Sequence, residues 1–356
     1  MRYVAIGCLR EGMILAKSLY SVNNDLLLSR GQKLIISYII KLKQLGYQGI
    51  YIEDDISKDI EIENVIKDEL RQKTINTVKD VFQNTRSGNK RSLEKSIGSS
   101  KRLVCDMVDQ ILDKRNTMLN IIDLKTFDDY TYYHSVNVAV LAISLGVAMG
   151  YNSGRLYNLG LGALFHDVGK VFIPKELLNK SAKLTDEEFK QIKEHPQLGC
   201  RYLVTNFSFS HDAYNTVMQH HERFDGSGYP FGLQGDQITQ NGKIIAISDV
   251  YDAMVSDRPY RKALPRAYVL EYIVSQNRTM FDPDVVHVFT RKIAPYPVGT
   301  FVYLSNGEKG IVIRNYEFFG NRPSVRIIDG KGKAVRDVCL KDDKRYLNVV
   351  ISGSDC

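Results

Sequence analysis

The sequence predicts a multidomain α+β protein, in which a mainly α-helical bundle forms the core, preceded by a small β/α module and followed by a small β-rich module. The length of 356 residues exceeds the roughly 150 residues of a typical single domain. In the middle of the chain, Val136, Val140 and Ile143 recur at spacings of three and four residues, which is typical of a helix. Near both ends, short apolar runs separated by turn residues predict strands. We therefore expect two or three domains, with the largest in the middle.

The small β/α module is expected over residues 1–58. Its short strands are interrupted by the turn residues Gly12 and Gly31. A helix is predicted over Ser37–Leu45, and a closing strand is predicted over Gly49–Glu53.

Residues 59–118 are expected to form a helical and basic linker region. Ile60–Phe82 has apolar residues at helical spacing, whereas Arg86–Arg102 is rich in Ser, Gly, Lys and Arg. The second stretch predicts a solvated tether. Its basic residues suggest contact with nucleic acid as the alternative, but no aromatic residues are interleaved with them to stack on bases. Nucleic acid is therefore not an expected partner.

The largest domain is expected over residues 119–294 and is mostly helical. Within it, Asp186–Lys193 is predicted to be a helix with Thr185 as its cap. After residue 294 the pattern changes to short β-rich runs, so that residues 295–356 predict a small antiparallel barrel or sheet. The expected strands are Thr300–Leu304, Gly310–Arg314 and Ser324–Ile328.

Composition restricts the setting in which the protein works. The 48 Lys and Arg residues against 41 Asp and Glu residues give a net charge of +7, which is modest for this length. Five cysteines lie far apart without a CxxC pair, which argues against a disulfide framework or a thiolate zinc site. The longest nearly apolar run, Val138–Met149, is shorter than the roughly 18 to 20 residues of a membrane helix, and the N-terminus lacks the apolar region of a signal peptide. We therefore expect a cytoplasmic protein without a membrane span.

Six of the seven histidines lie between His134 and His221, and this clustering predicts a metal site. Successive candidate ligands are separated by 32, 29, 25 and 28 residues, about one helix and a turn each, so a helical bundle can direct all of them to one point. A single histidine is more often a hydrogen-bonded core residue, but that alternative does not explain two adjacent pairs. Imidazoles and carboxylates suit Fe, Mn, Zn, Co or Ni, and seven ligands exceed the needs of one tetrahedral zinc ion. The candidate ligands are His134, His166, Asp167, His195, His220, His221 and Asp249.

The last histidine pair opens a distinctive loop sequence. His220–Pro230 reads HHERFDGSGYP. Gly226 and Gly228 permit backbone conformations closed to other residues, and Pro230 stiffens the exit from the loop.

This loop belongs to a longer set of motifs. His166–Lys170 upstream reads HDVGK, Ser248–Met254 downstream reads SDVYDAM, and Arg258–Arg261 reads RPYR. With these motifs in this order and spacing, the sequence closely resembles the HD-GYP phosphodiesterases, a branch of the HD hydrolase superfamily that cleaves cyclic di-GMP. The resemblance covers roughly Leu119–Ala294 and implies an HD-type helical bundle as the catalytic core.

The resemblance also implies roles for individual residues. The seven metal ligands that it implies are those chosen by spacing. Lys170 lies one helical turn after the His–Asp pair, within reach of a phosphate held by the metals, and the arginines at 258 and 261 share one face of a helix or turn. A surface salt bridge is the alternative for each basic residue. The residues that the resemblance places against the nucleotide or around its pocket are Lys170, Gly228, Tyr229, Asp252, Arg258 and Arg261.

One departure from the family bears on the number of metals. Some members carry a glutamate four residues before the first histidine ligand, where it helps to hold a third metal, but this chain has Tyr130 there. Asp129, five residues before His134, would point away from the metal face of a helix. We therefore expect two divalent transition-metal ions, with Fe or Mn favoured and Zn, Co or Ni left open.

The resemblance implies a metal-dependent phosphodiesterase that hydrolyses cyclic di-GMP to pGpG, with onward cleavage to GMP left open. Paired ions supply a hydroxide nucleophile at neutral pH and neutralise phosphoryl charge. Asp167 is expected to bridge the ions and Lys170 to stabilise the developing charge, which makes these two the predicted catalytic residues. Two alternatives remain: a receptor that binds cyclic di-GMP without cleaving it, and an HD hydrolase acting on another cyclic dinucleotide such as cGAMP.

The flanking modules are expected to be accessory. The N-terminal segment resembles small domains fused ahead of such phosphodiesterases, which suggests regulation by an unidentified partner or a contact in a homodimer. The C-terminal segment is expected either to cap the catalytic bundle by packing or to bind a ligand.

Overall fold

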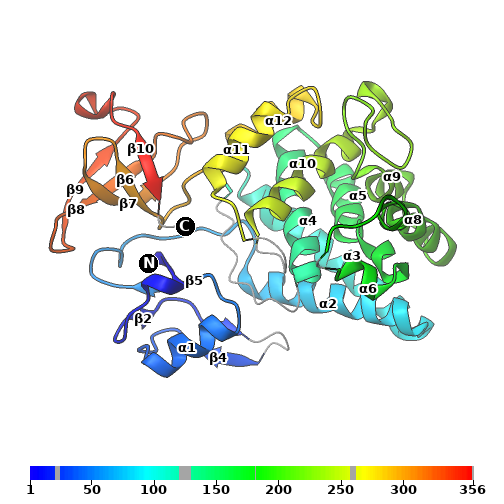
Figure 1. The fold of residues 1–356 in the computed structure, drawn as a ribbon, viewed down its shortest axis with the longest axis horizontal. Coiled ribbons are helices and arrows are strands. Elements are labelled where there is room, and N and C mark those ends of the chain that lie inside the picture. The colour runs from blue at the N-terminus through cyan, green and yellow to red at the C-terminus, as the bar shows by residue number, and fades with distance from the viewer. Residues whose placement is uncertain (21–24, 120–129, 181, 257–261, 355–356) are drawn as a thin grey trace.

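The computed structural model describes residues 1–20, 25–119, 130–180, 182–256 and 262–354. A helical bundle forms one side of the molecule, and two small β-containing modules, one from each end of the chain, lie together on the other side (Figure 1). The predicted multidomain α+β class is confirmed.

Over its described residues, the N-terminal module contains two small antiparallel sheets, one α-helix and a short 3-10 helix. Leu42 of the helix is buried together with Ile50 and Ile52 of the central strand, so the helix packs on the larger sheet. The predicted closing strand is confirmed within its expected bounds. The larger sheet has the order β1 (Arg2–Ala5), β5 (Gly49–Glu53), β2 (Ile14–Leu15). In the smaller sheet, β3 (Leu19–Tyr20) pairs with β4 (Leu26–Leu28). The helix is α1 (Ile36–Gln44).

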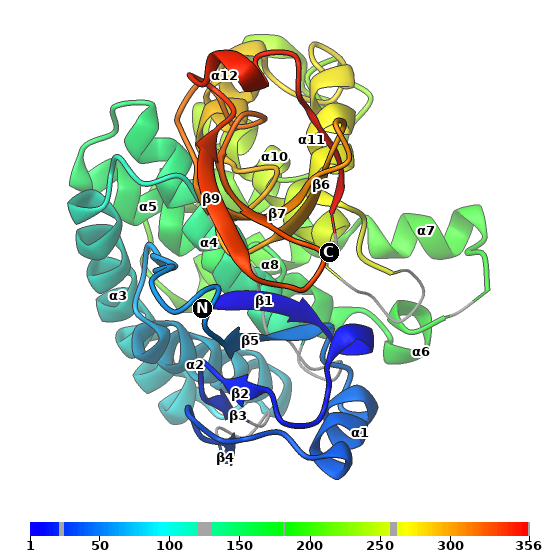
Figure 2. The ribbon, with the colours of Figure 1, turned by 90° about the vertical axis from the view of Figure 1, so that its left-hand side faces the viewer.

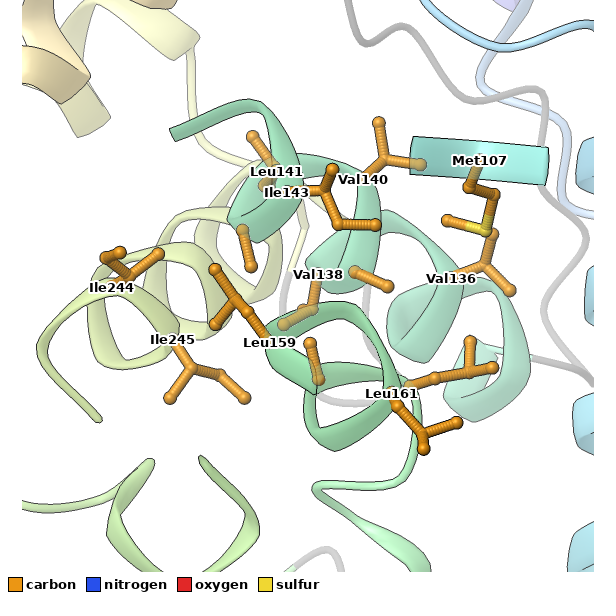
Figure 3. Packing of buried hydrophobic residues seen from close by; sticks show 14 of the residues in the cluster. Met107, Val136, Val138, Val140, Leu141, Ile143, Leu159, Leu161, Ile244 and Ile245 are labelled. Atoms are coloured by element: carbon orange, nitrogen blue, oxygen red, sulfur yellow. The ribbon is translucent and has the colours of Figure 1, made fainter. Parts of the chain in front are cut away.

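The bundle is built around α4 (Tyr130–Ala148), which packs against helices on every side. Val136, Val138 and Val140 of α4 are fully buried although they point in different directions around the helix, as expected for a helix with no solvent-exposed face (Figure 3). The other helices are α2 (Asp68–Ser87), α3 (Lys90–Asp113), α5 (Ser153–Leu164), α6 (Lys175–Leu178), α7 (Asp186–Ile192), α8 (His195–Asn206), α9 (His211–Gln219), α10 (Gln240–Val255), α11 (Arg266–Ser275) and α12 (Pro283–Lys292), with a 3-10 turn η3 (Val168–Phe172).

Helix α4 also contains the segment Thr131–Ala148, which is long and apolar enough to span a membrane by length and composition. In the structure, 78% of this segment is buried inside the protein. Its apolar residues therefore serve the core of the bundle, and core helices of this kind meet the same criteria as membrane helices.

The predicted tether over Arg86–Arg102 is wrong. The chain turns at Gly88, which has a φ of 70°, and then continues as the long helix α3. Leu93 and Ile97 recur at helical spacing and are buried against the bundle, with the same face continuing through Val104. The basic and small residues between them form the solvent face, which hid the helix in the sequence pattern. The structure thus places α2 and α3 in the same hydrophobic core as α4, α5 and α10.

Two smaller predictions concern local structure. The helix expected after Thr185 is confirmed: the Thr185 side chain accepts from the backbone N–H of Glu188, whose carboxylate accepts in return from the backbone N–H of Thr185. The expected C-terminal sheet is also confirmed, but it has five strands, two more than predicted. Its order is β10 (Ile351–Ser354), β6 (Phe301–Leu304), β7 (Lys309–Arg314), β8 (Ser324–Ile328), β9 (Ala334–Cys339).

The two terminal modules share a small hydrophobic core. Tyr3 and Tyr51 of the N-terminal sheet are buried together with Ile311 and Ile328 of the C-terminal sheet. The backbone N–H of Tyr3 donates to the carbonyl of Gly299, 3.1 Å away. Figure 2 shows β1 running beneath the C-terminal sheet. The C-terminal sheet therefore packs on the N-terminal module, a contact that the sequence did not suggest.

Candidate metal centre

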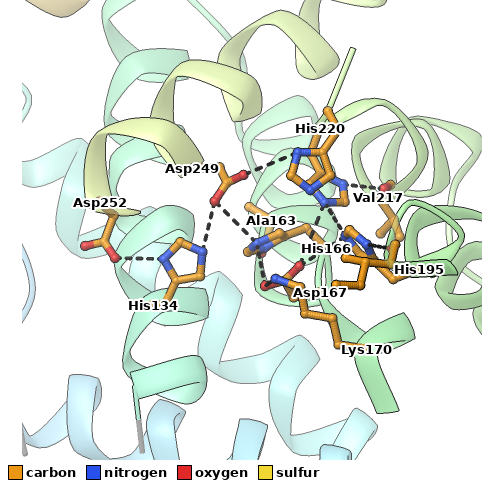
Figure 4. Close-up of polar contacts among 12 residues, drawn as sticks. His134, Ala163, His166, Asp167, Lys170, His195, Val217, His220, Asp249 and Asp252 are labelled. Carbon is orange, nitrogen blue, oxygen red and sulfur yellow. Dashed lines mark hydrogen bonds and ion pairs between the residues drawn. The ribbon is translucent and has the colours of Figure 1, made fainter. Parts of the chain in front are cut away.

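The structure brings all seven predicted metal ligands together at the centre of the bundle (Figure 4). Two groups of three have their ligand atoms within 4.8 Å of one another. Asp249 completes the set, with a carboxylate oxygen 3.0 Å from Nε2 of His134. The first group is His134, His166 and Asp167, and the second is His195, His220 and His221.

Local backbone geometry orients three of the imidazoles. Nδ1 of His166 lies 2.7 Å from the carbonyl oxygen of Ala163, three residues earlier. The rings of His195 and His220 make the same contact, at 2.8 and 2.7 Å, with the carbonyl three residues before each of them. A carbonyl can only accept, so Nδ1 carries the proton in each ring and Nε2 presents its lone pair to the site. Such a contact is the usual support of a metal-binding histidine.

Asp167 lies between the two groups. One of its oxygens is 3.5 Å from Nε2 of His166, whereas the other is 3.4 Å from Nε2 of His195 and 3.8 Å from Nε2 of His220. Its carboxylate therefore has one oxygen facing each group, which is the arrangement that a bridging ligand requires.

Asp249 has a similar position on the other side of the site. One of its oxygens lies near Nε2 of His134 and 4.0 Å from Nε2 of His166, and the other lies 3.9 Å from Nδ1 of His221. Helix α10 thus supplies a second carboxylate that faces both groups.

The protonation states of three of these side chains suit a cation. Burial lowers the pKa of His220 well below its ordinary value, and the neighbouring His221 lowers it further. Burial also lowers the pKa of His221, to about 3. For Asp167, burial alone would raise the pKa, but Lys170 and His166 outweigh it and hold that pKa well below its usual range. Neutral imidazoles and ionised carboxylates are the forms that bind metals.

Two buried atoms support the fit of a metal to this site. Among the residues that the structure describes, Nε2 of His166 and Oδ1 of Asp167 have no hydrogen-bond partner. A buried polar atom without a partner costs roughly 1 to 3 kcal/mol. Both atoms point into the space between the ligands, where a divalent ion would satisfy them.

His134 is supported by side chains in place of a backbone carbonyl. Its Nδ1 lies 2.8 Å from one oxygen of Asp252, whose other oxygen accepts from the side chain of Asn137 at 2.8 Å. Asp252 is only 1% exposed. These contacts correct the expectation that Asp252 faces the nucleotide, because a buried carboxylate engaged through both oxygens has no free side for a substrate. Its position beside His134 instead makes it a positioning residue for that ligand.

Lys170 lies where the sequence predicts, beside the ligand cluster. Its Nζ is 2.6 Å from the Asp167 oxygen that faces the first group, and its side chain is 33% exposed. A cation at the edge of the site, partly open to solvent, is suited to contact an incoming phosphate.

The glycines of the HHERFDGSGYP loop act for two different reasons. Gly226 has a φ of 83°, in the left-handed region that favours glycine. Gly228 does not; a Cβ there would lie 2.6 Å from the carbonyl oxygen of His221 and would also meet the backbone N of Arg223. Gly228 therefore lets the loop pack directly on the backbone that carries a candidate ligand, and its lining of the nucleotide pocket stays a prediction.

Tyr229 lies beside the ligand cluster. Its backbone N–H donates to the carbonyl of His221 at 3.1 Å, and its ring stacks on the His221 imidazole with centroids 4.6 Å apart. Lys193, which the sequence reasoning missed, lies 5.3 Å above the Tyr229 ring. It is the last residue of the predicted helix Asp186–Lys193 and belongs to no motif, so no sequence signal marked it.

Glu222 is a second residue that the sequence reasoning missed. Its buried carboxylate accepts from the backbone N–H groups of Phe231 and Leu233, at 2.8 and 3.0 Å, and so closes the loop. Two other predicted residues, Arg258 and Arg261, lie outside the described residues.

Comparison with known families locates this site within a known domain. The profile of the family described as "HD domain" matches residues 106–285, just over half of the chain. The match contains all seven candidate ligands.

Curated relatives and solved structures are similar to this chain, among them the following three. Cyclic di-GMP phosphodiesterase PA4108 of Pseudomonas aeruginosa is 40% identical over 215 residues, 59% of this chain and 52% of that protein. The 3'3'-cGAMP-specific phosphodiesterase 1 of Vibrio cholerae is 35% identical over 192 residues, 53% of this chain and 43% of that protein. The chain thus spans about half the length of these relatives. A solved structure of an HDG"Y"P protein from Bdellovibrio bacteriovorus matches with a TM-score of 0.51 and 20% identity, covering 81% of this chain and 97% of that one, which shows a shared fold.

Proposed function

The chain belongs to the HD-domain family, and on that premise we propose that it is a metal-dependent phosphodiesterase that hydrolyses cyclic di-GMP to linear pGpG. The observation that carries the proposal is the position of Asp167, with one carboxylate oxygen toward each of two histidine groups. The 40% identity to a curated cyclic di-GMP phosphodiesterase supports this choice of substrate.

We assign two divalent ions to the site, one to each group of ligands. When bound, such a pair supplies a hydroxide nucleophile near neutral pH and neutralises charge on the phosphoryl group. Iron or manganese is favoured because the donors are imidazoles and carboxylates without thiolates, and Zn, Co or Ni are the alternatives. The substitution of Tyr130 for the glutamate of some family members supports two ions rather than three.

The residues around the ligands would hold the substrate. Lys170 projects from η3 at the edge of the cluster and would stabilise the negative charge that develops on the phosphoryl oxygens. Tyr229, on the loop that packs against His221, would line the pocket that holds the dinucleotide beside the ligands. Arg258 and Arg261 remain proposed phosphate or guanine contacts on the strength of the motif alone.

A second substrate deserves a direct comparison. Because one relative is a 3'3'-cGAMP-specific phosphodiesterase, cGAMP is the alternative substrate for the same site. The two dinucleotides differ in one base, and the described contacts do not distinguish guanine from adenine.

The proposal extends to the rest of the chain. The catalytic domain would occupy residues 119–294, with a helical region over 59–118, the accessory module over 1–58 and the β-rich module over 295–356. We propose a cytoplasmic setting, and regulation by a partner or a homodimer contact through the N-terminal module.

The decisive experiment is product analysis by chromatography. The protein, loaded anaerobically with Fe(II) or Mn(II), is incubated separately with cyclic di-GMP, 3'3'-cGAMP and a panel of mononucleotides, beside an Asp167→Ala variant. We expect pGpG from cyclic di-GMP, with GMP as a slower second product, and no product from the variant. Faster cleavage of cGAMP would establish the alternative substrate, and tight binding of cyclic di-GMP without cleavage would identify a receptor.

A further inference from the structure

We propose that Arg71 and Asn137 are positioning residues for His134, so that helix α2 forms part of the metal centre. The inference rests on the proposed function in one respect, since it treats His134 as a metal ligand. Arg71 lies outside residues 106–285, the segment matched by the family profile, so the proposal extends the site beyond the recognised domain.

The structural basis is a chain of three hydrogen bonds. Nη1 of Arg71 donates to Oδ1 of Asn137 at 2.5 Å. Nδ2 of Asn137 donates to Oδ1 of Asp252 at 2.8 Å, and Oδ2 of Asp252 lies 2.8 Å from Nδ1 of His134. These bonds form a relay from Arg71 through Asn137 and Asp252 to His134. The relay connects three helices, α2, α4 and α10.

The chemistry of each group fixes which partner donates in each of these hydrogen bonds. A guanidinium can only donate, so Arg71 holds the amide oxygen of Asn137 toward itself and turns the amide NH₂ toward Asp252. A carboxylate can only accept, so Asp252 takes that bond on one oxygen and the Nδ1–H of His134 on the other. Nε2 of His134 is then left with its lone pair directed toward the other ligands of its group.

Burial makes the relay sensitive to the loss of any member. Asn137 is fully buried, and Asp252 and His134 are 1% and 2% exposed. Hydrogen bonds in such an environment reinforce one another, and a partner left unsatisfied is costly. The relay therefore has a strong preference for one arrangement of the His134 ring.

This support differs from that of the other ligands. His166, His195 and His220 are each held by a carbonyl three residues earlier in the chain, so their orientation is set locally. The orientation of His134 depends on Asp252, 118 residues away, and through Asn137 on Arg71. Loss of Arg71 should consequently affect the group that contains His134 and leave the group of His195 and His220 intact.

The outer end of the relay faces the N-terminal module. Arg71 lines a cavity of about 970 Å³, whose lining also includes Lys17 and Tyr51 of that module. Tyr133, the neighbour of His134, also lines this cavity. A displacement of Arg71 at the cavity is thereby transmitted to a metal ligand.

The test measures metal binding in the full-length protein. Arg71→Ala is compared with Arg71→Lys, which restores one donor, and with Lys73→Ala as a control that removes an exposed cation two residues away on the same helix. Bound Mn(II) per chain is titrated, and the absorption spectrum of the Co(II)-substituted protein reports the ligand environment. Loss of a residue that supports a ligand typically weakens metal affinity about 10- to 100-fold.

We expect Arg71→Ala to lower the affinity for one of the two ions by about tenfold or more and to change the Co(II) spectrum. The affinity of Arg71→Lys should be intermediate, and that of Lys73→Ala should equal the wild type. Asn137→Asp keeps the shape of the side chain but removes the donor toward Asp252, and it should lower the affinity for the same ion. A lower melting temperature with an unchanged Co(II) spectrum would show a merely structural role and overturn the proposal. An equal loss of affinity for both ions would also overturn it. Since the readout is metal binding, it stands even if the protein fails to cleave a cyclic dinucleotide, so the two proposals fail separately.

Discussion

Nε2 of His195 and Nε2 of His220 lie 3.0 Å apart, although Nδ1 of each ring contacts a backbone carbonyl. With both Nδ1 atoms protonated, the two Nε2 atoms are acceptors that face each other, and this contact needs a cation or a shared proton between them. Burial and the neighbouring imidazole of His221 lower the pKa of His220, which disfavours the proton. A metal ion resolves the contact, and the first two predictions below follow from this reading of the site.

Asp167→Ala should abolish hydrolysis and reduce the bound metal from about two ions per chain, because it removes the carboxylate that faces both groups and leaves two cations repelling each other. Elemental analysis of protein purified anaerobically measures the loss. His211→Ala is the matched control, since His211 is exposed at the start of α9 and contacts Asn215. Equal losses in both variants would contradict ligation by Asp167, and three tightly held ions in the wild type would contradict the expected count.

Lys170→Ala should lower the turnover number roughly 10²- to 10³-fold, the scale for losing one preorganised charge donor, while the metal content stays unchanged. Steady-state kinetics at matched metal loading test this. Lys175→Ala, which removes an exposed lysine on α6, should have no effect. If Lys170→Ala raises KM and leaves the maximal rate alone, the lysine contributes only to ground-state binding.

Gly169→Ala should destabilise the protein by about 1 to 3 kcal/mol or more and displace His195. A Cβ at position 169 would overlap the carbonyl oxygen of His195 and lie 2.6 Å from the backbone N of Gly199, so η3 and α8 could not keep their contact. Gly98→Ala is the opposite case, because Gly98 lies within α3 with open space around it. There the substitution should stabilise the protein by about 0.5 to 1 kcal/mol. Thermal unfolding with a metal titration measures both, and similar stability of the two variants would refute the close-packing argument.

The ion pair between Asp59 and Arg326 should make the joint between the terminal modules pH-dependent. Arg326 donates to both oxygens of Asp59, at 2.6 and 2.8 Å, and this hydrogen bonding lowers the pKa of Asp59 to about 2. A folded pKa below the unfolded value means that the stabilisation is present above about pH 4 and is lost as the pH falls toward 2. The Asp59 side chain is 59% exposed, so the pair contributes no more than about 1 kcal/mol.

Thermal unfolding tests this ion pair. Asp59→Asn should melt below the wild type at pH 7, and the difference should shrink as the pH falls from 4 toward 2. Glu61→Gln, an exposed carboxylate in the same connecting segment, should melt like the wild type. A difference in melting temperature between Asp59→Asn and the wild type that stays constant with pH would argue against the ion pair.

The sequence by itself determined the class of the fold and the seven candidate metal ligands that meet at the site. His166 and Asp167 are adjacent, as are His220 and His221, and such pairs stand out because metal ligation constrains both residue type and spacing along the chain. Local rules were equally informative for the cap at Thr185 and for the strand Gly49–Glu53, since the interactions that form these elements lie within a few residues.

Only the tertiary structure decided which residues act through others and what the ends of the chain pack against. The segment Arg86–Arg102, predicted to be a tether, lies largely in helix α3 because Leu93 and Ile97 pack against apolar residues of helices distant in sequence. Asp252 turned out to support His134, a contact across 118 residues that no local pattern encodes. The common core of the two terminal modules has the same origin: the sequence shows that Tyr51 and Ile311 are apolar, but only the folded chain shows which surfaces they bury against each other.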